Sequence, residues 1–201
     1  YANGILKIIP EEYTDVKFSH YKGQALAARA FAYLQLIQTY QFTYLTHKDA
    51  LGVPIVTEET SISQAANNPR AKVEDVYNLI LSDLTQAIEL LDGFKRSGKD
   101  AIDLNVAYGL RARTNLLMGK WDDAAKDADK AMEGYSPYTL EEVSKPTFNS
   151  ASANSWIWAN IITEDNDVVK TGIINWPSHL CSLNGSGYAV QTGTWRRISK
   201  L

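Results

Sequence analysis

The sequence has very little cysteine, no long apolar run and no excess of positive charge. Cys181 is the only cysteine among 201 residues, so the chain can form neither an intrachain disulfide nor a cysteine-based zinc site. No apolar run reaches the roughly 18 residues that a transmembrane helix needs. The formal net charge of -3 argues against nucleic acid as a partner, because nucleic-acid-binding proteins usually carry a basic excess.

Residue patterns for catalysis and metal binding are also weak. His20, His47 and His179 are too far apart in sequence to form a metal-ligand motif. The acidic turn at 164–167 lacks the glycine and the distal glutamate of an EF-hand loop, so we expect a solvated turn. Glu58 and its neighbour in sequence would point in opposite directions on an extended chain, unlike the facing carboxylates of a glycosidase. We therefore expect no enzyme, no cofactor and no metal site.

A signal peptide is absent as well. The chain begins at Tyr1 within a helical pattern and stops at Leu201 without a tail. We therefore expect it to be a fragment of a longer protein, and the missing signal does not inform localisation.

What the sequence does contain is helical periodicity, which is clearest between residues 103 and 133. Asp103 suits a helix N-cap, and Gly119 suits the left-handed residue after a helix. Spaced alanines in 121–133 would let a neighbouring helix approach closely. A Gly-Lys-Trp corner followed by spaced alanines is typical of a tetratricopeptide hairpin, although any antiparallel helix pair would also fit.

Two more long helices are predicted at 21–40 and 73–91, each with apolar residues at helical spacing. Arg29 lies inside the first apolar pattern, where we expect a snorkelling side chain that keeps its charge in water. Pairing 21–40 with 73–91, and 103–118 with 121–133, gives a short helical-repeat array.

The rest of the chain lacks helical period. Residues 41–70 contain a short extended piece followed by a polar loop. The apolar run 156–162 is predicted as a strand or as extended chain against the helices. We therefore predict one domain over 1–201, mainly α with little strand, with a helical core at about 21–133 and a loop-rich region at 134–201.

Three segments carry a recognisable combination of motifs. They are GQALAARAFAY at 23–33 with GVPIV at 52–56, the Val-Tyr…Ile…Asp-Leu…Ala pattern within 70–91, and the hairpin pattern within 107–128. In this order and spacing they resemble the SusD/RagB-like nutrient-binding lipoproteins. Gln24 departs from the glutamate that is usual in the first motif, and the chain is less than half the usual family length.

The resemblance implies a tetratricopeptide-like α–α superhelix that carries long irregular loops. It also implies a lipid-anchored protein on the outer surface of a Gram-negative outer membrane, with the anchor outside this fragment. There it would bind oligosaccharides or other nutrients without catalysis and deliver them to a SusC-like TonB-dependent transporter. A generic tetratricopeptide-like scaffold for protein–protein interaction is the alternative.

Aromatic residues in the last third are the candidate ligand contacts, because flat rings can pack on the apolar faces of sugars while polar side chains reach the hydroxyls. The predicted ligand-binding residues are Trp176, Tyr188, Trp195, Asn184 and Arg196. Packing beneath a loop is the alternative for each ring. Trp121 is expected in the core, and Trp156 and Trp158 in the core or at a helix–loop junction.

Overall fold

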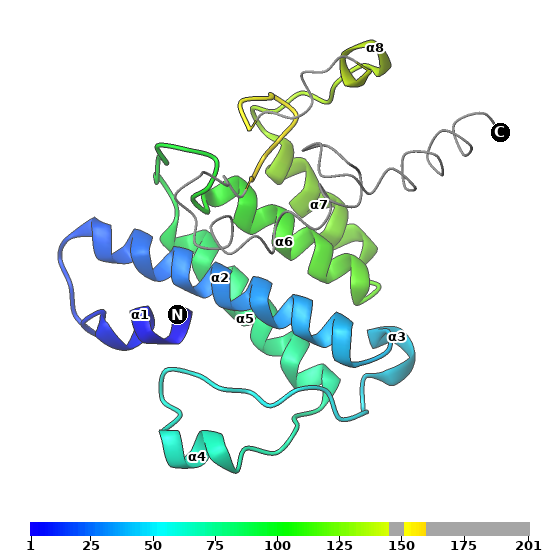
Figure 1. Cartoon of the computed structure of the whole chain (residues 1–201). Coiled ribbons are helices and arrows are strands. Elements are labelled where there is room, and N and C mark those ends of the chain that lie inside the picture. The colour runs from blue at the N-terminus through cyan, green and yellow to red at the C-terminus, as the bar shows by residue number, and fades with distance from the viewer. Residues whose placement is uncertain (145–150, 160–201) are drawn as a thin grey trace, which may run out of the picture. The chain divides into compact units, whose positions relative to one another are not determined.

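Helices supply almost all of the regular structure in residues 1–144 and 151–159, which are the residues that the computed structural model describes (Figure 1). Their bounds are α1 (Ala2–Ile8), α2 (Val16–Tyr40), α3 (Tyr44–His47), α4 (Ile62–Ala66), α5 (Val73–Leu90), α6 (Leu104–Leu117), α7 (Trp121–Met132) and α8 (Leu140–Val143). The β pairing within these ranges is one isolated antiparallel bridge between Leu51 and Lys72. The predicted mainly α fold with little strand is confirmed. No helix in the described part of the chain is both long enough and apolar enough to cross a membrane.

The long helices are paired as the sequence predicts. α2 packs along α5, α6 packs along α7, and contacts between α5 and α6 join the two pairs (Figure 1). The most deeply buried large apolar side chains are Leu34, Ile37, Ile80, Leu84, Leu91, Val73 and Val76. All lie on or beside α2 and α5, so the core is centred on this first pair.

A glycine allows α2 and α5 to approach closely. A Cβ at Gly23 would lie 2.8 Å from Leu91 Cγ and 3.1 Å from Leu90 Cβ, whereas a Cβ at Gly4 in α1 would meet nothing within 4 Å. Gly23 is buried and Gly4 is exposed, but both lie inside helices. The two glycines therefore form a matched pair for separating helix propensity from packing.

We expect Gly23→Ala to destabilise the protein by about 1 kcal/mol, since overpacking against Leu91 outweighs the gain in helix propensity. Gly4→Ala should instead be stabilising by up to about 1 kcal/mol, because only the propensity term acts there. Urea unfolding measures both. Equal stabilisation by the two variants would show that α2 and α5 are not in close contact at Gly23.

The α6–α7 hairpin begins and turns as predicted. The Asp103 carboxylate accepts a hydrogen bond from the Val106 amide at 3.0 Å, and Gly119 has a φ of 76°. The prediction that Trp121 lies in the core is wrong, because the residue is 60% exposed. Trp121 is the first residue of α7 and lies at the corner, beyond the last turn of α6, so the opposite helix does not cover it.

Helix ends that depend on capping differ from the prediction. α2 begins at Val16 rather than near residue 21, because the Asp15 side chain accepts a hydrogen bond from the Lys17 amide at 2.9 Å. α4 lies in the predicted polar loop, where Ser61 and Gln64 form a capping box. Residues 156–159 form no strand, but Ile157 and Trp158 pack against the helical core, in line with the other arrangement predicted for this run. Residues 160–162 lie outside the described residues.

Arg29 is buried, so the snorkelling interpretation is wrong. Its Nε and Nη2 donate to the two carboxylate oxygens of Asp83 at 2.7 and 2.8 Å. Its Nη1 donates to Asn3 Oδ1 at 3.1 Å and also pairs with the Glu58 carboxylate. One guanidinium therefore joins α1, α2, α5 and the turn that precedes α4. Arg29 can be buried because Asp83 supplies a partner charge within the apolar face of α5.

Burial and pairing act in opposite directions on these charges. Burial by itself would lower the pKa of Arg29, but the hydrogen bonds and charges of Asp83 and then Glu58 raise it overall. Burial raises the pKa of Asp83, although Arg29 opposes this rise. Burial would also raise the pKa of Glu58, but a backbone hydrogen bond and Arg29 together lower it.

The lowered pKa of Glu58 predicts a pH-dependent contribution to stability. A carboxylate with a folded-state pKa below its unfolded value stabilises the protein fully above that unfolded value, here 4.5, and loses the effect as the pH falls through the folded pKa. The difference in Tm between wild type and Glu58→Gln should therefore be largest at neutral pH and shrink below pH 4.5. Glu59→Gln, at the exposed neighbour, is the control. A difference that stays constant across the acid range would contradict this role for Glu58.

Candidate functional site

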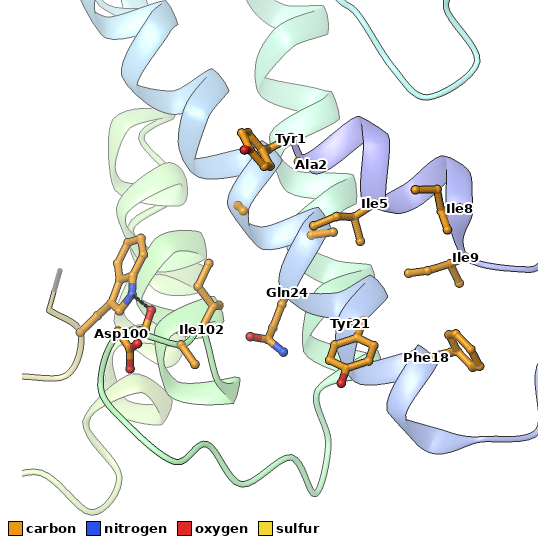
Figure 2. A pocket seen from close by; sticks show the side chains of 14 residues that line it. Tyr1, Ala2, Ile5, Ile8, Ile9, Phe18, Tyr21, Gln24, Asp100 and Ile102 are labelled. Carbon is orange, nitrogen blue, oxygen red and sulfur yellow. Dashed lines mark hydrogen bonds between the residues drawn. The ribbon is translucent and has the colours of Figure 1, made fainter. Parts of the chain in front are cut away.

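The described residues form an apolar groove between α1, α2 and the connector that precedes α6 (Figure 2). Its volume is about 580 Å³. The principal lining residues are Tyr1, Ile5, Ile8, Ile9, Phe18, Tyr21, Gln24, Asp100, Ile102 and Trp158. The groove thus combines several aromatic rings with two polar side chains, Gln24 and Asp100.

Two of its walls are formed by α1 and the first half of α2. α1 buries Leu6 against the core and leaves Ile5 and Ile8 exposed toward the groove. On α2, Tyr21 and Gln24 are one turn apart and project from the same side of the helix (Figure 2). Tyr21 is 55% exposed, so its ring is available to a ligand.

The third wall is held by a cluster of hydrogen bonds around Arg96. Arg96 pairs with Asp103 at 2.8 Å and donates to the carbonyls of Ala101 and Ile157 at 2.9 and 2.6 Å. These contacts fix the connector and the segment that carries Trp158 to each other.

Trp158 lies at a helix–loop junction, one of the two places expected for it. Its Nε1 donates to the Asp100 carbonyl at 3.0 Å, and its ring packs edge to face on Phe31 with 5.1 Å between the ring centroids. Because both contacts restrain the indole, Trp158 forms a fixed part of the groove rather than a mobile side chain.

The chemistry of the groove suits binding. Aromatic and apolar side chains can cover the C–H faces of a sugar ring, while the Gln24 amide and the Asp100 carboxylate can reach hydroxyls. Asp100 is the one carboxylate among the described lining residues, whereas glycoside hydrolysis requires two carboxyl groups that flank the bond. Residues 1–144 and 151–159 also contain no cluster of three metal-ligating side chains.

The structure does not describe the five ligand-binding residues predicted from the sequence. Trp176, Tyr188, Trp195, Asn184 and Arg196 lie outside the described residues, as does the acidic turn at 164–167. They therefore stay predictions.

Sequence reasoning missed the groove. Tyr21 belongs to the predicted helix 21–40, and Phe18 lies before that predicted helix begins. The available signal was the four large apolar residues at 5, 8, 18 and 21, all of which the structure leaves exposed.

Comparison with known proteins assigns these features to a family. A SusD-like family model, described as starch-binding and associating with the outer membrane, matches residues 1–116. The structure is similar to that of a SusD-like carbohydrate-binding protein from Bacteroides vulgatus, with 34% identity and a TM-score of 0.74 over 82% of this chain and 35% of that chain. No curated protein matches the chain.

Two further solved structures share the fold. A SusD superfamily protein from Bacteroides thetaiotaomicron is 22% identical, with a TM-score of 0.70 over 83% of this chain and 36% of that chain. Another, from Bacteroides fragilis, is 27% identical, with a TM-score of 0.62 over 82% of this chain and 37% of that chain. The chain therefore spans little more than a third of the length of these relatives.

Proposed function

The chain belongs to the SusD-like family, and from this premise we propose that it binds carbohydrate without transforming it. The observation that carries the proposal is the family-model match over residues 1–116. The groove of Figure 2 supports it, because its aromatic rings and its two polar side chains suit the two kinds of surface on a sugar. The match to a family described as starch-binding favours a glycan over the protein partner of a generic helical-repeat scaffold.

In this proposal the groove holds a sugar chain through ring packing and rim hydrogen bonds. Tyr21 and Trp158 cover apolar sugar faces, and Gln24 and Asp100 bind hydroxyls. Trp176, Tyr188, Trp195, Asn184 and Arg196, in the region 134–201, are proposed as further contacts. Residues 1–201 would then act as one SusD-like domain.

The proposal extends to the cellular setting. The family description supports association with the outer membrane. We propose that the full-length protein is held by a lipid anchor at the outer surface and delivers its oligosaccharide to a SusC-like TonB-dependent transporter. Copurification of that transporter with the tagged full-length protein tests this part separately from glycan binding.

Affinity electrophoresis of the whole chain in gels that contain soluble starch, laminarin, xylan or pectin tests glycan binding directly. We expect at least one polysaccharide to retard the chain, with no new reducing ends after prolonged incubation. Migration equal to that of a non-binding reference protein in all four gels would contradict carbohydrate binding. Release of reducing ends would contradict the non-catalytic role.

Tyr21→Ala should weaken binding of the retarding polysaccharide about fivefold or more, because a lost ring contact costs about 1 kcal/mol. Tyr40→Ala is the matched control, since Tyr40 lies on the same helix with 64% exposure but outside the groove. Titration of oligosaccharide into each variant measures the change. Equal affinity of the Tyr21 and Tyr40 variants, with a loss in Trp176→Ala or Trp195→Ala, would move the site to the region 134–201.

A further inference from the structure

A second depression surrounds α4, on the loop that leaves the helical core after α3 and returns to it at α5 (Figure 1). Its volume is about 670 Å³. The polar side chains that line it are Glu59, Thr60, Ser63, Gln64, Asn67 and Asn68. Ile55 and Pro69 add a small apolar surface, so the depression differs sharply in character from the apolar groove.

The backbone around this depression is held by its own hydrogen bonds. Ser61 and Gln64 form the capping box of α4, and the Asn68 side chain donates to the Ile55 carbonyl across the base of the loop. The Tyr33 hydroxyl accepts from the Val56 amide at 2.6 Å and fixes the start of the loop to α2. The polar side chains are therefore presented on an ordered frame, which lowers the entropy cost of binding a ligand.

Several polar groups on this frame face solvent with hydrogen-bonding capacity to spare. The Glu59 carboxylate and the Asn67 amide are exposed and have no hydrogen-bond partner among residues 1–144 and 151–159. Gln64 uses its Oε1 in the capping box, which leaves its Nε2 as a donor. Together these groups offer both donors and acceptors without a large aromatic surface.

We propose that this depression is a second carbohydrate-binding site, which recognises the hydroxyl face of a sugar. Neighbouring hydroxyls present donors and acceptors in pairs, and a side-chain amide beside a carboxylate can satisfy both. The inference rests on the proposed function and adds a site that holds its ligand by hydrogen bonds rather than by ring packing. Two sites raise the retention of a polymer above that of either site alone.

Hydrogen–deuterium exchange of the whole chain, with and without soluble starch or laminarin, tests the second site. The variant Glu59→Ala/Asn67→Ala removes two exposed groups that bond nothing else in the described structure. Asn78→Ala/Glu89→Ala removes the same two side-chain types from exposed positions on α5 and serves as the matched control. Both variants should fold normally because all four side chains lie in solvent.

We expect the retarding polysaccharide to slow exchange at residues 57–68 in wild type, in the control and in Tyr21→Ala. Glu59→Ala/Asn67→Ala should abolish this protection and weaken retention about fivefold, as for the loss of one or two hydrogen bonds. Retention with protection confined to the groove would overturn the second site and leave the proposed function intact. Absence of retention by every polysaccharide would overturn both, and protection at 57–68 that persists in Glu59→Ala/Asn67→Ala would overturn the assigned residues.

Discussion

Arg29→Met should destabilise the protein by about 3–5 kcal/mol, because it leaves the Asp83 carboxylate buried without its partner charge. The Asp83 side chain is only 2% exposed, so water cannot replace the two lost hydrogen bonds. Burial already raises the pKa of Asp83, and loss of Arg29 removes the opposing influence. Since a group with a raised folded pKa favours folding in its protonated form, the loss of stability should shrink as the pH falls.

Urea unfolding at neutral and acid pH measures this effect. Arg113→Met is the matched control, because Arg113 is exposed on α6 and should change stability by less than about 0.5 kcal/mol. Arg29→Met/Asp83→Leu should recover most of the loss, since it removes both buried charges. A loss in Arg29→Met no greater than that in Arg113→Met would show that the buried pair does not hold α2 to α5.

Arg96→Ala should also cost about 3 kcal/mol and should weaken ligand binding at the groove. The substitution removes the partner of Asp103 and the donor to the Ala101 and Ile157 carbonyls, which are only partly accessible to water. Because these contacts position the connector and the Trp158 segment, the third wall of the groove should loosen. Exchange at residues 99–103 should therefore accelerate more than exchange in the centre of α5.

Arg113→Ala provides the comparison, because Arg113 is an exposed arginine on α6 that forms no ion pair within the described residues. It should leave unfolding, exchange and binding unchanged. If Arg96→Ala loses stability but binds oligosaccharide with the wild-type affinity, the connector does not contribute to the site.

The long helices could be predicted because each repeats an apolar pattern over many residues. The α6–α7 hairpin also carried local signals at Asp103 and Gly119, and both act in the structure as expected. The short helix α4 could not be identified from period, because five residues make little more than one turn and only its capping box marks it. Helix α2 begins earlier than predicted because the Asp15 side chain caps it, and the apolar period does not reveal that cap.

Contacts between distant residues were harder to predict. Arg29 pairs with Asp83, which lies 54 residues further along the chain. Taken alone, each looks like an ordinary charged residue. A single arginine and a single aspartate inside two apolar patterns would have been the useful signal. Trp121 shows the opposite error, since a tryptophan in a helical pattern was expected in the core but lies at an uncovered corner.

The groove could not be predicted because three separate segments form it. Tyr21 comes from α2, Ile5 from α1 and Trp158 from beyond α8, and no local pattern links them. The aromatic residues in the last third of the chain predicted a ligand-binding site there instead. The resemblance in the helices, by contrast, identified the family, which the match over residues 1–116 confirms.

Calorimetric titration of the whole chain with an oligosaccharide from the retarding polysaccharide tests the central claim most directly. Binding without turnover predicts saturable heat that returns to the baseline after each injection, with the starting oligosaccharide recovered unchanged. Heat that continues to flow after each injection, together with shortened products, would contradict the account.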